Sequence, residues 1–225
     1  MMFDLDGTLI NSLADLAAAG NHILEMHGYP THPTDAFRLF VGDGMLNLTR
    51  RMLPKELVLE EDAVIRLKEE LQAYYYDHSL ERTAPYPGIE ALLRFCKMHG
   101  LRLGVFTNKP DAAAHRVVAA LFGADVFDAV IGHREGRPHK PDPTAVLEEL
   151  EAFGIRPADC FYVGDSGVDM QTARNAGCIP VGVLWGFRGY EELVQNGAKF
   201  LMESPEKLKN LVASAIDEAC PLRIK

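Results

Sequence analysis

The chain has 225 residues, of which 48% are hydrophobic and 24% charged, and its formal net charge is −9. This composition is typical of a globular protein with a sizeable core and excludes a chain that is disordered throughout. The excess of acidic residues disfavours nucleic acid as a partner, and no stretch is long and apolar enough for a membrane span. Because Asp4 and Asp6 interrupt the N-terminus, we expect no secretory signal and a cytoplasmic location. The oligomeric state is left open.

The first part of the chain predicts one short strand followed by helices. The apolar run from Met1 to Leu5 indicates a buried strand, which Gly7 brings to an end. Apolar residues then recur at helical spacing in three segments, which are residues 13–27, 45–53 and 60–78. No strand is expected between residues 30 and 80.

After a boundary at Pro85 to Gly88, the pattern changes to strands that alternate with helices. The expected strands are residues 101–108, 126–131, 160–165 and 179–185. The expected helices are residues 89–99, 111–122, 144–153, 168–176 and 203–219. Because the chain must cross back before it can add a parallel strand, this alternation predicts a parallel sheet with crossover helices.

We therefore predict an α/β fold in which a doubly wound parallel sheet forms a Rossmann-like core that carries an inserted α-helical cap. The hydrolase-like core would consist of residues 1–12 and 83–225. The helical segment of residues 13–82 lies between the first and second strands in the chain, so we expect a cap inserted into the core and not a domain that follows it.

Unusual polar residues fall at the ends of the expected strands, where loops converge in an open parallel sheet. The residues expected to meet there are Asp4, Asp6, Thr107, Asn108, Lys140, Asp165, Ser166 and Asp169. Acids gathered around a lone lysine in a buried crevice need neutralisation, because unpaired buried charge is costly. Oxygen ligands without Cys or His favour Mg²⁺, which we expect as the cofactor.

The spacing of Asp4 and Asp6 suits phosphoryl transfer. Asp4 is the candidate nucleophile that attacks phosphorus. Asp6 is the candidate acid/base, which protonates the leaving alcohol and later activates the water that cleaves the aspartyl-phosphate. Lys140 would neutralise the phosphoryl oxygens, and the Thr107 hydroxyl would donate a hydrogen bond to them.

Four segments together resemble the motifs of haloacid dehalogenase-like hydrolases: DLDGTL, VFTN, HKPDP and GDSGVDM. The resemblance covers essentially the whole chain. It implies that Asp4, Asp165 and the backbone carbonyl of Asp6 bind Mg²⁺. The residues that it places on the phosphate, or in support of the metal ligands, are Thr107, Asn108, Lys140, Ser166 and Asp169. Only two residues precede Phe3, so the first strand is shorter than is usual in the family, as a truncated or misassigned start would produce.

Within that superfamily, the segments VGDGMLNLTRRML, YVGDSGVDMQTARNAG and GVLWGFRGYEEL resemble phosphoglycolate phosphatases. This implies hydrolysis of a small phosphorylated metabolite, with 2-phosphoglycolate as the first candidate. Two further features could read the substrate. The turn Gly42-Asp43-Gly44 could place backbone N–H groups against its far end, although a plain helix–helix turn explains it equally well. Arg50 or Arg51 could bind a substrate carboxylate.

Several alternatives stay open. A phosphomutase, a pyrophosphatase or a nucleotidase of the same superfamily shares this chemistry, whereas Asp6 disfavours a dehalogenase because halide needs no proton. A receiver-like signalling module also surrounds a phosphorylated Asp with acids, Thr and Lys. Its acceptor normally follows a strand in the middle of the chain, however, and Asp4 is at the start. A non-catalytic scaffold is disfavoured because no motif position is missing.

Overall fold

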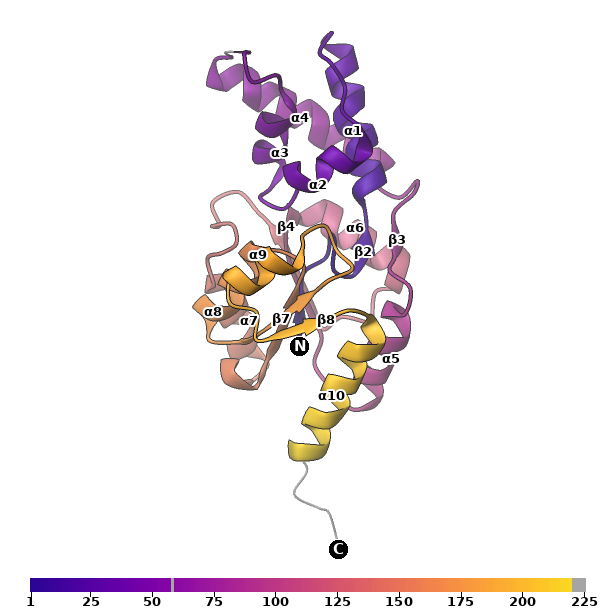
Figure 1. Cartoon of the computed structure of the whole chain (residues 1–225), viewed down its shortest axis with the longest axis vertical. Helices are drawn as coiled ribbons and strands as arrows, with labels where there is room; N and C mark the ends of the chain where they lie inside the picture. Colours follow the sequence, from indigo (N-terminus) through magenta and orange to yellow (C-terminus); the bar gives the residue numbers. More distant parts are fainter. Residues whose placement is uncertain (58, 220–225) are drawn as a thin grey trace, which may run out of the picture.

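A computed structural model describes residues 1–57 and 59–219 (Figure 1). A six-stranded sheet lies at its centre, with the order β5-β4-β1-β6-β7-β8 and parallel pairing between all neighbours. Its strands are β1 (Met2–Phe3), β4 (Gly104–Pro110), β5 (Ala129–His133), β6 (Phe161–Gly164), β7 (Ile179–Val183) and β8 (Phe200–Met202). The short first strand therefore lies between β4 and β6, and the predicted parallel α/β sheet is confirmed.

Helices cover both faces of the sheet, as a doubly wound fold requires. One face packs against α5 (Ile89–Met98), α6 (Asp111–Phe122) and α10 (Pro205–Ala219). The other packs against α7 (Thr144–Ala152) and α8 (Gly167–Ala176), and α9 (Tyr190–Gln195) lies beside α8. Alternate strand residues point to opposite faces: Phe3, Val105 and Val163 belong to the first core, and Met2, Phe106 and Tyr162 to the second.

A group of helices lies beyond one end of the sheet, at the top of Figure 1. It consists of α1 (Leu13–Met26), a 3₁₀ helix (Thr34–Ala36), α2 (Phe37–Phe40), α3 (Met45–Met52) and α4 (Glu61–His78). These helices bury a hydrophobic cluster of their own, which includes Phe37, Met52, Leu71 and Tyr75.

The chain enters and leaves the helical group through two short strands. They are β2 (Ile10–Asn11) and β3 (Ala84–Pro85), which pair antiparallel to each other. Asp15, at the start of α1, is buried and accepts hydrogen bonds from the backbone N–H groups of Arg82 and Thr83. The two segments that connect the helical group to the sheet are therefore held side by side.

The structure differs from the sequence prediction mainly in the short elements. The strand expected at residues 101–108 begins at Gly104, because the N–H of Leu103 donates to the Asp128 carboxylate (2.8 Å) instead of to a sheet neighbour. The strand expected at residues 126–131 begins later, at Ala129. Elements that were not expected are β2, β3, α2, α9, β8 and the 3₁₀ helices Thr34–Ala36 and Pro157–Asp159. Throughout residues 1–57 and 59–219, every helix is too short or too polar to span a bilayer.

Candidate active site

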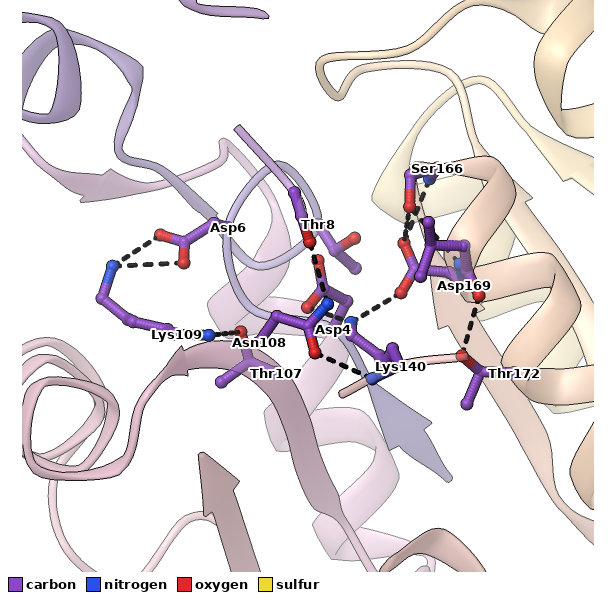
Figure 2. A network of polar contacts seen from close by, with 12 residues as sticks. Asp4, Asp6, Thr8, Thr107, Asn108, Lys109, Lys140, Ser166, Asp169 and Thr172 are labelled. Atoms are coloured by element: carbon purple, nitrogen blue, oxygen red, sulfur yellow. Dashed lines mark hydrogen bonds and ion pairs between the residues drawn. The ribbon is translucent and has the colours of Figure 1, made fainter. Parts of the chain in front are cut away.

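The strand ends bring the predicted polar residues to one edge of the sheet (Figure 2). Asp4 directly follows β1, and its backbone N–H donates to the Val163 carbonyl of β6 at 2.8 Å. Asp165 directly follows β6, while Thr107 and Asn108 lie within β4. These residues line one pocket together with Asp6, Lys140 and Ser166, and residues of the helical group close its other side.

Lys140 joins two of the acids. Its Nζ lies 2.7 Å from Asp4 Oδ1 and 2.7 Å from Asp169 Oδ1, and its side chain is only 3% exposed. The backbone N–H of Lys140 donates to Asn108 Oδ1 at 2.9 Å, which anchors the loop that carries it. Burial alone would lower the pKa of Lys140, but Asp169 and Asp4 raise it well above its ordinary value. Lys140 is therefore a permanent cation beside Asp4.

Two of the buried acids have raised pKa values even though Lys140 lies close by. Burial raises the pKa of Asp4 to about 7, against the lowering effect of Lys140 and with a further rise from Asp169. Burial also raises the pKa of Asp165 well above its ordinary value, and the charges of Asp169 and Asp4 add to this. Ionising all three carboxylates therefore requires positive charge in addition to Lys140.

The oxygens of Asp4, Asp165 and Asp169 lie within 4.8 Å of one another, and all three residues are buried. A group of oxygen ligands at this spacing could hold a hard divalent cation. The grouping contains the two carboxylates expected as ligands, Asp4 and Asp165, and adds that of Asp169. Asp169 therefore lies beside the candidate metal centre, as its expected supporting role requires.

Asp169 also holds the start of α8. Ser166 Oγ and the Ser166 N–H donate to Asp169 Oδ2 at 2.6 and 3.1 Å, and the Asp169 N–H donates back to Ser166 Oγ. This reciprocal pair is a capping box, which satisfies N–H groups that have no partner inside the helix. One carboxylate thus orients Lys140 through Oδ1 and the helix start through Oδ2.

Asp165 is held by residues from two loops. The Phe187 N–H donates to Asp165 Oδ2 at 2.7 Å, and Thr8 Oγ1 donates to Oδ1 at 3.3 Å. Gly7 passes directly over this carboxylate with φ +89°, and a Cβ at Gly7 would lie 2.3 Å from Asp165 Oδ2. Glycine is therefore required there for both its backbone conformation and its small size.

A second lysine in the pocket was missed by the sequence analysis, so the expectation of a lone lysine was wrong. Lys109 Nζ lies 2.8 and 3.1 Å from the two carboxylate oxygens of Asp6 and 2.6 Å from Tyr75 Oη. Burial alone would lower the pKa of Lys109, but Asp6 and Tyr75 raise it above its ordinary value. Ser12 Oγ also donates to Asp6, at 2.5 Å.

Figure 2 makes the resulting division visible: Asp6 points to Lys109 on one side, while Asp4, Lys140 and Asp169 form a separate network. Tyr75 is buried on α4 and lines the pocket. It brings a hydroxyl from the helical group to a lysine of the sheet.

Thr107 and Asn108 occupy the wall between the two networks. Thr107 Oγ1 accepts from the Lys109 N–H at 3.2 Å, which leaves its own proton available as a donor. Asn108 Oδ1 is occupied by Lys140, and its Nδ2 donates to the Gly42 carbonyl of the helical group at 3.0 Å. Asn108 therefore positions two loops, in addition to its expected place beside the phosphate.

The turn at residues 42–44 reaches the pocket only in part. Gly42 and Gly44 line it, with φ of +115° and +84°, whereas the Asp43 carboxylate forms an ion pair with Arg51. Arg50 pairs with Glu61. Neither Arg50 nor Arg51 is among the pocket-lining residues. The arginine that does line the pocket is Arg188, which the sequence analysis did not single out although it lies in the quoted segment GVLWGFRGYEEL.

Comparison with known proteins agrees with this geometry. Residues 1–183 match the family described as haloacid dehalogenase-like hydrolase. The chain is 37% identical over 198 residues to a phosphoglycolate phosphatase of Neisseria meningitidis serogroup A, a match that covers 87% of this chain and 84% of the relative. It is 30% identical over 226 residues to phosphoglycolate phosphatase 1 of Pseudomonas aeruginosa, covering 99% and 81% of the two chains.

Solved structures share the architecture. The crystal structure of a predicted phosphoglycolate phosphatase from Haemophilus somnus has a TM-score of 0.87 and 28% sequence identity, and the match covers 94% of this chain and 96% of the other. CbbY from Rhodobacter sphaeroides has the same fold, with a TM-score of 0.76 and 22% identity over 92% and 94% of the two chains. The chain therefore belongs to the family of haloacid dehalogenase-like hydrolases.

Proposed function

We propose that this protein is a Mg²⁺-dependent phosphatase of small phosphate monoesters and that 2-phosphoglycolate is its substrate. The observation that carries the proposal is the meeting of Asp4, Asp165, Asp169 and Lys140 in one buried cluster. The relatives named phosphoglycolate phosphatase support the choice of substrate.

The residues present fit a divalent cation. Three buried carboxylates face one ammonium group, and burial raises the pKa of both Asp4 and Asp165, so that ionising them calls for further positive charge. Asp4 and Asp165 would hold the metal together with the backbone carbonyl of Asp6, and Asp169 would support them. When bound, Mg²⁺ would supply charge that stabilises the phosphoryl oxygens and keeps Asp4 ionised at neutral pH.

The side chains then divide the chemistry among them. An Asp4 carboxylate oxygen attacks phosphorus, and the bond from phosphorus to the ester oxygen breaks while Asp6 transfers a proton to the leaving alcohol. A water molecule next attacks the phosphorus of the aspartyl-phosphate and gives its proton to Asp6, which releases phosphate and regenerates Asp4. Lys140 and the Thr107 hydroxyl stabilise the charge on the phosphoryl oxygens throughout.

We also propose that residues 13–82 act as a cap over a core made of residues 1–12 and 83–225. The separate hydrophobic cluster of α1 to α4 and the paired crossings β2 and β3 support this division. In this proposal the cap closes the pocket over the leaving group and excludes bulk water.

The test is phosphate release from a panel of 2-phosphoglycolate, pyrophosphate, sugar phosphates and nucleotides, with and without Mg²⁺. We expect turnover of 2-phosphoglycolate that excess EDTA abolishes and Mg²⁺ restores. A folded Asp4→Asn variant should release no phosphate, because an amide is not a nucleophile toward phosphorus. Turnover by that variant or in excess EDTA would contradict the mechanism. Transfer of phosphate to a second hydroxyl would instead identify a phosphomutase, and stable phosphorylation without turnover a receiver-like module.

A further inference from the structure

Arg188 lies at the border between the sheet and the helical group and carries a polar atom without a partner. It belongs to the loop that joins β7 to α9 and lines the same pocket as Asp4. Its Nη2 donates to the Val41 carbonyl at 2.8 Å, and its Nε lies 3.5 Å from Glu192 Oε2. Its Nη1 is buried and has no hydrogen-bond partner among the described residues.

The other cations of the pocket are already engaged. Lys140 contacts Asp4 and Asp169, and Lys109 contacts Asp6. A buried guanidinium N–H without a partner is costly, so a pocket that retains one is arranged for an acceptor that arrives with a ligand. That acceptor must also be an anion or a strongly polar oxygen, because Arg188 carries a full positive charge.

The position of Arg188 indicates which end of a substrate it meets. The phosphoryl group has to face Asp4 and Lys140 at the strand ends, so the remainder of the ester extends toward the helical group. Arg188 is bound to that side through Val41, and its Nη2 would lie 3.7 Å from a Cβ at Gly42 in the turn opposite the strands. Its side chain is 13% exposed and is held at Nη2 and Nε, so its fork is oriented before a ligand binds.

We propose that Arg188 binds the carboxylate at the non-transferred end of the substrate and thereby selects phosphorylated small carboxylic acids. The proposal rests on the phosphatase function above and assigns its specificity to Arg188 in place of Arg50 or Arg51. A guanidinium N–H and a carboxylate oxygen form a charge-assisted hydrogen bond, whereas an ester that ends in a methyl group leaves Nη1 without a partner. Discrimination therefore arises from both the bond gained and the buried donor left unsatisfied.

The experiment compares two phosphonates that the mechanism does not cleave, 3-phosphonopropionate and propylphosphonate, which differ in a carboxylate against a methyl group. Calorimetric titration of the full-length protein with Mg²⁺ should give 3-phosphonopropionate about 10- to 100-fold tighter binding. In Arg188→Met this ratio should fall to within about threefold of one. In Arg188→Lys, which keeps the charge but loses the planar fork, the ratio should be intermediate.

Arg38→Met is the matched control. Arg38 Nη1 donates to the Gly186 carbonyl at 3.1 Å, so it also bridges the helical group and this loop, but it does not line the pocket. We expect this variant to keep the binding ratio of the wild type. Equal binding of both phosphonates by the wild type, or an unchanged ratio in Arg188→Met, would overturn the proposal. Circular dichroism accompanies each titration to check that the variant is folded. If Arg188→Met does not fold, the binding ratio of Arg188→Lys tests the proposal, and a ratio equal to that of the wild type would overturn it.

A parallel assay separates this proposal from the proposed function. The ratio of kcat/KM for 2-phosphoglycolate to that for ethyl phosphate should fall by the same factor in Arg188→Met. If the wild type binds 3-phosphonopropionate selectively but releases no phosphate from any ester, the proposed phosphatase function fails while the role of Arg188 stands. A loss of the same size on both esters would place Arg188 on the phosphoryl group and contradict the proposal.

Discussion

Asp4 and Asp6 are two residues apart in the chain, yet each contacts a different lysine. Asp4 shares Lys140 with Asp169, and Asp6 contacts Lys109 and Ser12. Two like acids in unlike environments can take different chemical roles, which is the usual arrangement of a nucleophile beside an acid/base. The contact with Lys109 holds the Asp6 carboxylate away from the Asp4 network, on the side of the pocket that faces Tyr75.

The acid/base role proposed for Asp6 predicts that activity depends on the leaving group. Asp6→Asn should reduce kcat/KM for an alkyl phosphate such as ethyl phosphate by about 10² to 10⁴. It should reduce that for p-nitrophenyl phosphate much less, because p-nitrophenolate leaves without a proton. Steady-state kinetics on both esters measure this, and thermal melting checks the fold. Losses of equal size on the two esters would argue against the acid role.

The close approach of Gly7 to Asp165 gives a second prediction, with an internal control. Gly7 and Gly28 both have positive φ, of +89° and +71°, but a Cβ at Gly28 meets nothing within 4 Å. Gly28→Ala should therefore cost about 1–2 kcal/mol of unfolding free energy from backbone strain alone. Gly7→Ala should cost more and also impair phosphate release, because it displaces Asp165. Urea unfolding and activity measure both, and equal costs with full activity would contradict the contact.

The meeting of Asp4, Thr107 and Asp165 could be predicted because a parallel sheet brings all its strand ends to one edge. Lys109 could not, because its partners Asp6 and Tyr75 lie 103 and 34 residues away and its own segment reads as the start of a helix. Arg188 could not be predicted either, because the sequence does not show that one of its nitrogens is buried without a partner.

Among the secondary-structure elements, α4 connects the two parts of the molecule most directly. Its residues Glu61–His78 form the longest described helix, and near its end Tyr75 reaches Lys109 in β4. The helix packs on α1 and α3 within its own cluster. Tyr75 therefore contributes both to the core of the helical group and to its contact with the sheet.

Removing this hydroxyl tests the contact. Tyr75→Phe should lower the unfolding free energy by about 1.5–3 kcal/mol, because it removes a buried hydrogen bond to a charged group. Tyr76→Phe is the matched control. Tyr76 is 40% exposed, and it contacts the Arg116 guanidinium through its ring, which phenylalanine retains. We expect the control to stay within about 0.5 kcal/mol of the wild type in urea unfolding. Equal changes in the two variants would remove the proposed link.

The longer elements were predictable and the shorter ones were not. Helical periodicity defines α1, α4 and α6 within about a residue of their ends, because each presents one apolar stripe to a core. In contrast, α9 has six residues and β8 has three, too few for a period to stand out. The start of β4 depends on a hydrogen bond from Leu103 to the distant Asp128 carboxylate, and the local sequence pattern does not predict that contact.

For the molecule as a whole, the acids of the pocket link stability to pH and to metal. The pKa of Asp4 rises to about 7 in the metal-free fold, from an ordinary value of 3.8. Between these two values the folded state binds more protons than the unfolded state. Raising the pH through this range therefore removes stability instead of adding it. Bound Mg²⁺ would offset this loss, since it adds positive charge beside the ionised carboxylate.

Melting temperatures in EDTA test this linkage. Relative to the wild type, Asp4→Asn should gain melting temperature as the pH rises from about 4 to 7, because the amide does not ionise. Excess Mg²⁺ at pH 7 should reverse the order of the two proteins, since the wild type gains a ligand that the variant binds less well. A difference that stays constant across the pH range in EDTA would contradict the raised pKa.

The hydrogen bonds that join the helical group to the sheet beside the pocket have a consequence for how the sequence of such a protein can change in evolution. Arg188, Asn108 and Arg38 donate to the main-chain oxygens of Val41, Gly42 and Gly186. Every residue type offers that oxygen, so the side chain at the acceptor position 41 can be exchanged without losing its bond, whereas the three donor side chains must stay. Variation at position 41, which lines the pocket, can then alter the shape of the space beside the strand ends while the acids and Lys140 keep their places.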